Sequence, residues 1–220
     1  MESITHYLKR YSLAEILSAD LIDSIRLLRS EAGEFLIKKG EKVDYLRFFV
    51  EGKAKVYSRM ENGSSLLVRF YKPFDILGDV ELFAYERFIL DVEAVTTTVC
   101  LAVGVDTIKR AAERNGPLLM YLCERLGRKL ADFNSTAAIN LRYPVENRFA
   151  SYLLAAADEE DSGLSTDDLG ELADILGSSY RQLARVVRHF REEGILDAAR
   201  GRIRVLDVEA LRPLARDLYI

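Results

Sequence analysis

The sequence predicts an α+β protein with three parts: an all-β module, a long helix and a C-terminal winged helix-turn-helix. Three observations support this order. Between residues 31 and 103, short apolar stretches with a period of two are separated by glycine turns, which is typical of a barrel or jelly-roll. Residues 117–140 keep a helical apolar pattern. Residues 164–193 contain two short amphipathic helices joined by a tight turn.

Length and composition limit the class of protein. A chain of 220 residues with 49% hydrophobic content can form one large or two modest packed domains. The sequence shows neither a secretory signal nor an apolar run of membrane-spanning length, so we expect a cytoplasmic protein. Two cysteines and two histidines are too few for a zinc site or an iron–sulfur cluster within one subunit. No metal or other cofactor is therefore expected.

The N-terminal part is expected to begin with helices and continue as strands. Residues 2–28 carry a broken apolar stripe at helical spacing. Strands are predicted at 35–37, 46–50, around Val56, and at 66–70, 91–94 and 99–103. Asn62-Gly63 is a good hairpin signal between two of them. Asp106 or Thr107 is expected to cap a short helix that ends near Arg114.

The long helix is predicted from Pro117 to about Asn140, with proline in the first turn, where it is tolerated. It is apolar on more than one side. We interpret one near-heptad stripe as the seam of a coiled-coil dimer. The members of this predicted seam are Leu119, Leu122, Leu126, Phe133 and Ala137. The alternative is a single buried helix in a monomer.

The helix-turn-helix is the most specific signal in the chain. Ser165 and Asp168 form a capping-box pattern for the first helix, with Leu164 and Leu169 placed as a hydrophobic staple. Gly177-Ser178 supplies the turn, because glycine permits backbone conformations that side chains resist. In the second helix, four apolar residues at i, i+3, i+4 and i+7 predict one buried face. They are Leu183, Val186, Val187 and Phe190.

The opposite face of the second helix is basic. Arg181, Arg185 and Arg188 follow i, i+4, i+7 spacing, with His189 beside them. Such a row of guanidinium groups suits guanine edges and phosphates in a DNA groove, although a solvated face is the ordinary alternative. Together with the capped first helix and the turn, it favours DNA binding. The predicted contacts are Ser178, Ser179, Tyr180, Arg181, Gln182, Arg185, Arg188, Arg200 and Arg202.

The basic character is local, because the whole chain has a net charge of −4. Residues 178–204 contain seven arginines against three acidic residues. Residues 195–197 and 202–206 are predicted as two short strands around Arg200-Gly201, which would form a wing beside the phosphate backbone. Asp207 is expected to cap a final helix through Leu218. The expected domains are residues 1–116, 117–143 and 144–220.

Three segments of the chain carry a family resemblance: GEFLIKKGEKVDYLRFFVEGKAKVY, GDVELF and LGSSYRQLARVVRHFREEGIL. They resemble the cyclic-AMP receptor protein and FNR (Crp-Fnr) family of bacterial transcription regulators, and its YeiL-like branch in particular. The resemblance covers nearly the whole chain. It implies a double-stranded β-helix like that of cyclic-nucleotide-binding domains, and a homodimer that binds a palindromic operator and contacts RNA polymerase. It also implies an effector pocket formed by Gly78, Asp79, Val80, Glu81, Leu82, Arg87 and Phe88.

The chain departs from the family at this pocket. Cyclic-nucleotide binders close the segment with arginine and a hydroxyl residue, whereas this chain reads Phe88-Ile89-Leu90 and has only Arg87 nearby. Without a phosphate clamp, we expect cyclic AMP to bind poorly. Asp79 and Glu81 could contact a ribose, or could be turn-capping or solvated carboxylates. The cysteines of an FNR-type cluster and the ligands of a haem sensor are missing from this sequence.

Several alternatives stay open at this point. The signal could be an apolar or uncharged small molecule, the redox state of Cys123, or no ligand at all; Cys100 and Cys123 are more often plain packing residues. A different class would be an enzyme that uses Asp79 and Glu81, placed in one loop, with a protein-docking winged helix. No phosphate loop, metal cluster or activated nucleophile in the sequence supports that enzyme. An effector-binding protein that titrates a partner would leave the arginine face unexplained.

Overall fold

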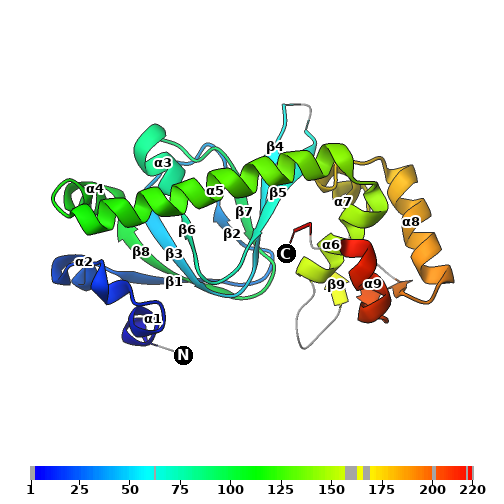
Figure 1. Ribbon diagram of the computed structural model, residues 1–220, viewed down its shortest axis with the longest axis horizontal. Helices are drawn as coiled ribbons and strands as arrows, with labels where there is room; N and C mark the ends of the chain where they lie inside the picture. The colour runs from blue at the N-terminus through cyan, green and yellow to red at the C-terminus, as the bar shows by residue number, and fades with distance from the viewer. Residues whose placement is uncertain are drawn as a thin grey trace. The chain divides into compact units, whose positions relative to one another are not determined.

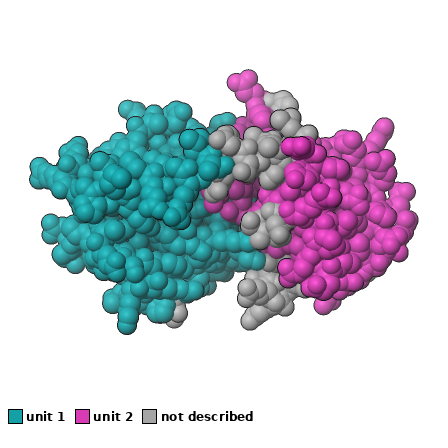
Figure 2. All heavy atoms as spheres, in the orientation of Figure 1, with its two compact units in different colours: residues 1–55, 71–132 teal, residues 56–70, 133–220 magenta. Residues whose placement is uncertain are grey.

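The computed structural model describes residues 3–61, 63–156, 163–165, 169–199, 202–216 and 218–219, with the backbone alone for 132–141 and 163–165. Figure 1 shows the helices and strands in chain order. They form two compact units, one of residues 1–55 and 71–132 and the other of residues 56–70 and 133–220 (Figure 2). The combination of helices with antiparallel sheets confirms the predicted α+β class.

The chain begins with three short helical segments: α1 (Ile4–Arg10), the 3-10 turn η1 (Leu13–Glu15) and α2 (Ala19–Asp23). The prediction of helix to residue 28 is wrong at its end, where strand β1 (Arg26–Ser30) begins. The register of β1 explains the error, because Arg26 to Ser30 pair antiparallel with Ala102 to Thr98. Long-range pairing overrides a local apolar pattern that is compatible with either structure.

Two four-stranded sheets contain the strands of the β-roll. The first has the order β1-β8-β3-β6, with β8 (Thr98–Gly104), β3 (Tyr45–Glu51) and β6 (Asp75–Leu77). The second has the order β2-β7-β4-β5, with β2 (Phe35–Ile37), β7 (Asp91–Ala94), β4 (Ala54–Arg59) and β5 (Ser65–Tyr71). All the predicted strands are present. The short strand β6 and the helix α3 (Asp79–Ala84) that follows it were not anticipated.

The core of the first unit lies between one face of the β1-β8-β3-β6 sheet and the helices. In β3, where Phe49 on the opposite face is buried as well, Leu46, Phe48 and Val50 occupy every second position and are completely or almost completely buried. They belong to one apolar cluster with side chains from α1, α2, α4 (Val105–Ala112) and the start of α5 (Gly116–Arg142). Helix α4 begins directly after Gly104, so the expectation of an Asp106 or Thr107 cap is wrong.

The second unit contains the helices α6 (Val145–Ala156), α7 (Leu169–Ile175), α8 (Tyr180–Glu192) and α9 (Val208–Ala215). Helix α6 packs against α8 and α9, and the Phe149 and Phe190 rings stack with their centroids 5.9 Å apart. A three-stranded sheet has the order β10-β11-β9, with β10 (Leu196–Ala199), β11 (Arg202–Val205) and β9 (Gly163–Ser165). The antiparallel pair of β10 and β11 confirms the predicted wing strands.

Other local predictions have mixed outcomes. Ser165 lies in β9, where it pairs with Arg202, and the Asp168 half of its predicted capping box lies outside the described residues. Asp207 does cap α9, by accepting a hydrogen bond from the Ala210 amide at 2.9 Å, but the helix ends at Ala215. Asn62 lies outside the described residues, while Met60 donates to the Ser64 carbonyl across the expected hairpin turn.

Candidate DNA interface and sensor site

Helix α8 starts at a well-defined cap. The Ser179 hydroxyl accepts a hydrogen bond from the Gln182 amide at 3.3 Å, and the Ser179 amide donates to Gln182 Oε1 at 3.4 Å. This reciprocal pair satisfies amide groups that a helix start would leave without partners. The side-chain oxygen of Gln182 therefore has a structural role in the cap.

The turn before α8 depends on Gly177. Its φ of +58° lies in the left-handed region, and its amide donates to the Asp174 carbonyl at 2.8 Å. The next amide, that of Ser178, donates to the Ala173 carbonyl at 2.8 Å. These bonds close the C-terminal end of α7, as glycine at this position commonly does. The predicted turn thus fixes where α8 begins.

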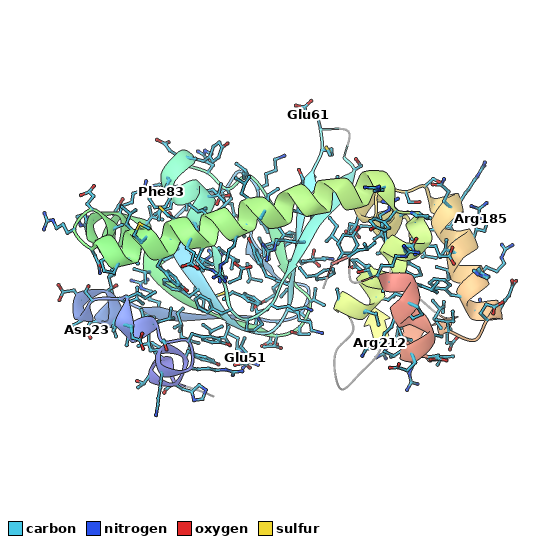
Figure 3. The ribbon with its side chains drawn as sticks, viewed as in Figure 1. Asp23, Glu51, Glu61, Phe83, Arg185 and Arg212 are labelled. Atoms are coloured by element: carbon cyan, nitrogen blue, oxygen red, sulfur yellow. The ribbon has the colours of Figure 1, made fainter. Side chains whose placement is uncertain are left out.

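The two faces of α8 separate as the sequence predicts. The four apolar residues of its inner face, Leu183, Val186, Val187 and Phe190, are buried. Arg181, Arg185 and Arg188 are exposed, and so is Tyr180 at the start of the helix. Figure 3 shows the Arg185 side chain projecting outward from α8. The helix therefore presents a row of guanidinium groups to solvent on a well-packed base.

The wing adds further cations. On β11, Ile203 and Val205 are buried, while Arg202 and Arg204 alternate with them and are exposed. This alternation is the period-two pattern of a strand with one packed face. Arg200 and Gly201, at the predicted tip, lie outside the described residues. The described part of the wing therefore has Arg202 and Arg204 on its exposed face.

The structure divides the residues of the predicted effector pocket. Asp79, Glu81, Leu82 and Phe88 are buried, together with Gly78, whereas Arg87 is exposed. The Arg87 guanidinium donates to the Gly40 carbonyl at 2.8 Å. Val80, in the first turn of α3, is partly buried. The one predicted cation of the pocket is therefore held at the surface by a main-chain oxygen.

The expected loop placement of the acidic residues is wrong, and so is the alternative that they are solvated. Asp79 and Glu81 belong to helix α3 rather than a loop, and both are buried rather than solvated. Asp79 Oδ1 lies 2.7 Å from Lys129 Nζ, on α5. Glu81 Oε1 accepts from the Ile89 amide at 3.3 Å, and burial raises the pKa of the Glu81 carboxyl. Asp79 is thus held in an ion pair with Lys129, and Glu81 in a main-chain hydrogen bond.

Sequence reasoning missed Lys129 as a site residue. The signal was present, because Leu122, Arg125 and Lys129 lie at positions i+4, i+7 and i+11 from Leu118. All four therefore share one face of α5. Leu118 and Leu122 are fully buried in the core of the first unit. Two cations that continue a buried face need buried partners, because an unpaired buried charge is costly. The partner of Lys129 is Asp79.

The two thiols differ in burial. Cys100 is buried, and burial raises the pKa of its thiol to about 12, so it stays protonated and unreactive. Cys123 is exposed on α5. Within the described ranges, no group of three or more His, Cys, Asp or Glu side chains could hold a metal ion. In the same ranges, no helix combines the length and hydropathy needed to cross a membrane.

Two known sequence families match the chain. The family described as "Cyclic nucleotide-binding domain" matches residues 27–115, and the "Crp-like helix-turn-helix domain" matches residues 147–214. Regulatory protein YeiL of Escherichia coli O157:H7 is 25% identical over 177 residues, 80% of each chain. The cAMP-activated global transcriptional regulator CRP of Salmonella typhimurium is 25% identical over 172 residues, covering 74% of this chain and 81% of the relative.

A solved structure shows the same fold. A crp/fnr-family transcriptional regulator from Eubacterium rectale aligns with a TM-score of 0.79 and 21% identity, covering 93% of this chain and 97% of the relative. The order of its parts therefore agrees with the order observed here.

Proposed function

We propose that this chain, which belongs to the Crp-Fnr family of transcription regulators, is a cytoplasmic homodimer. It binds a palindromic operator and contacts RNA polymerase. The families and relatives that match the chain are those of DNA-binding regulators and not of enzymes. The chain is likewise a DNA-binding regulator and not an enzyme. The observation that carries the proposal is the exposed row of Arg181, Arg185 and Arg188 on α8. A capped helix with a packed apolar base and this outer face suits the major groove.

The dimer proposal rests on the second face of α5. Leu122 packs into the core of its own unit, so it does not belong to the seam. Leu119 and Leu130 are 38% and 64% exposed, and Cys123 between them is exposed as well. With the partly buried Leu126 they follow 4-3-4 spacing, which is the heptad pattern of a two-stranded coiled coil. Phe133 and Ala137 continue this spacing, in a part of α5 without described side chains.

DNA binding is tested by selecting sites from randomised duplexes and measuring affinity at several salt concentrations. We expect a palindromic site, and an affinity that falls steeply between about 50 and 200 mM salt, because phosphate contacts release counterions. Binding that does not depend on salt, or no binding to any duplex, would contradict the proposal. It would favour the protein-docking alternatives.

The dimer has a test of its own. In a parallel coiled coil, identical seam positions face each other, so Cys123 of the two subunits would meet. Mild oxidation should produce a disulfide-linked dimer on a non-reducing gel, in wild type and Cys100→Ser but not in Cys123→Ser. Leu126→Glu should prevent the link and convert the native protein to monomers, because it buries unpaired charge. A monomer that still protects a palindrome from cleavage would show that the dimer is unnecessary.

Cyclic AMP is not the expected signal. The only cation of the predicted pocket, Arg87, is exposed and bonded to Gly40, and Phe88 is buried where a clamp would be needed. Asp79, a possible ribose contact, is already paired with Lys129. Titration calorimetry with cyclic AMP and cyclic GMP should show no binding at micromolar concentrations. A micromolar dissociation constant for either nucleotide would contradict this.

A further inference from the structure

A buried lysine joins α5 to the β6–α3 segment inside the first unit. Lys129 Nζ lies 2.7 Å from Asp79 Oδ1 and 3.7 Å from Asp75 Oδ1. It also donates to the Ile76 carbonyl and lies 3.3 Å from the Tyr71 hydroxyl. The Lys129 side chain is only 13% exposed, and that of Asp79 is 1% exposed. All the nearby acceptors come from residues 71–79.

A second cation one turn earlier strengthens this attachment. Arg125 Nη2 donates to the Phe74 carbonyl at 2.8 Å and lies 3.5 Å from Asp75 Oδ1. Its guanidinium carbon is 5.6 Å from the centre of the Phe74 ring. The two cations of α5 and the two carboxylates, Asp75 and Asp79, balance in charge. The cluster formed by these four side chains is called the α5 lock below.

Each charge in the α5 lock depends on its partner. An unpaired charge at this depth would be costly, and removing one member of a buried pair is much more destabilising than removing an exposed one. Burial lowers the pKa of Lys129, but Tyr71, Asp79 and Asp75 outweigh it, and the pKa ends above the ordinary lysine value. The ammonium group therefore stays charged throughout the physiological pH range. The lock does not open by titration of Lys129.

The α5 lock includes a carboxylate, that of Asp79, which a diffusible ligand could otherwise contact. Asp79 follows Gly78 in the GDVELF segment, where the family resemblance suggests an effector contact. Here its Oδ1 faces the ammonium group of Lys129 instead. Helix α5 then continues without interruption to Arg142, three residues before α6 begins. A change in how α5 docks can therefore be passed along one continuous helix.

We infer that Lys129 replaces a diffusible effector: its ion pair with Asp79 docks α5 on the β-roll, so that the protein binds DNA without a small molecule. Lys129 is thus a positioning residue that acts through α5. The inference rests on the proposed function, since DNA binding is the output that α5 would control. It identifies the ligand-independent form as the working state of this regulator.

The test compares Lys129→Met with Arg128→Met in the full-length protein. Arg128 is the matched control, because it is an adjacent cation whose pair with Glu124 is exposed on both sides. Lys129→Met should increase amide hydrogen exchange along residues 118–131 and weaken operator binding by about 5- to 150-fold, a usual range for coupling between sites. Lys129→Arg, which keeps the charge, should restore part of the protection from exchange and part of the operator affinity. Arg128→Met should behave as wild type in both measurements.

Wild-type protein, freed of small molecules by unfolding, dialysis and refolding, should bind its operator without additions. The low-molecular-weight fraction of a cell extract should leave that affinity unchanged. Normal exchange and normal operator binding in Lys129→Met would overturn the inference, and so would a wild type that binds only after the extract is added. If Lys129→Met does not fold, Asp79→Asn removes one charge with little change in shape, and unchanged exchange there would overturn the inference as well.

Failure of the proposed function gives a different result. If wild type binds no DNA under any condition, the proposal of DNA binding is wrong. Hydrogen exchange, measured without DNA, still shows whether Lys129 docks α5. Equal exchange in wild type and Lys129→Met would then reject the docking itself.

Discussion

The guanidinium of Arg148, on α6, donates from Nη1 to the main-chain oxygen of Leu176, immediately after α7. Its Nε donates to the Tyr143 carbonyl at 3.2 Å, and the residue is buried. A Cβ placed on Gly177 would lie 3.3 Å from Arg148 Nη1, so the turn glycine leaves room for this contact. Arg148 therefore ties the helix-turn-helix turn to α6. It positions α8 without belonging to its exposed face.

We predict that Arg148→Met lowers the free energy of unfolding by about 1.5 to 3 kcal/mol, because a buried carbonyl loses a charged donor. Binding to specific and random DNA should weaken by the same factor, since Arg148 reads no base. Urea denaturation and fluorescence anisotropy on both kinds of duplex measure the two effects. Arg212→Met is the control, because the pair of Arg212 with Glu209 is exposed. A loss confined to the specific sequence would contradict this role.

The cap of α8 gives a second stability prediction. Ser179→Ala removes the oxygen that accepts from the Gln182 amide, and should cost about 1 kcal/mol of unfolding free energy. Ser179→Thr keeps a hydroxyl at the same place and should lose much less. Denaturation midpoints of the three proteins provide the comparison. Equal stability of wild type and Ser179→Ala would show that the capping box contributes nothing measurable.

The buried Glu81 predicts a dependence of stability on pH. Burial raises the pKa of the Glu81 carboxyl in the folded state. The contribution of Glu81 to folding stability is therefore fully present below the ordinary glutamate pKa, and is lost as the pH rises through the folded-state pKa. Glu81→Gln, which stays neutral, should therefore raise the melting temperature at neutral pH. The gain should shrink as the pH falls toward about 4.3, the ordinary value.

The exposed Glu86 provides the control for this measurement. Glu86→Gln should leave the pH dependence of the melting temperature as in wild type. A Glu81→Gln protein that is less stable than wild type at neutral pH would show that the ionised carboxylate is needed there.

The sequence was sufficient where a structure depends on local pattern. The apolar face of α8, the turn at Gly177 and the strand β3 all follow from local sequence, and all are present. It was insufficient where distant segments decide the structure. Strand β9 has three residues, too few for any period, and exists through its pairing with β11. Local sequence therefore predicts a helix staple at Leu164, which instead pairs with Ile203 in the sheet.

The same limit applies to the sensor site. Lys129 and Asp79 are separated by 50 positions, so their pairing cannot be read from either local sequence. Asp79 was expected in a loop because three-residue β6 and six-residue α3 carry little periodic signal. Buried charges are especially difficult to foresee, since their position depends on a partner elsewhere. The DNA interface was predictable because its exposed arginines belong to one helix.

The final prediction concerns how α8 reads bases. Arg181 and Arg185 lie in the first half of the helix, the half that usually enters the major groove, and both are exposed. Guanidinium groups donate only, so each suits the two acceptors of guanine and neither can accept a hydrogen bond from cytosine. Arg181→Ala and Arg185→Ala should each lose about 1 to 3 kcal/mol at one base position and relax the preference there.

Arg202→Ala, on the wing, should instead weaken binding to all sequences similarly and reduce the salt dependence of the affinity, as expected for a phosphate contact. Selection on randomised half-sites with wild type and these three variants measures the base preference of each. An unchanged preference in both α8 variants would show that sequence is read by other residues.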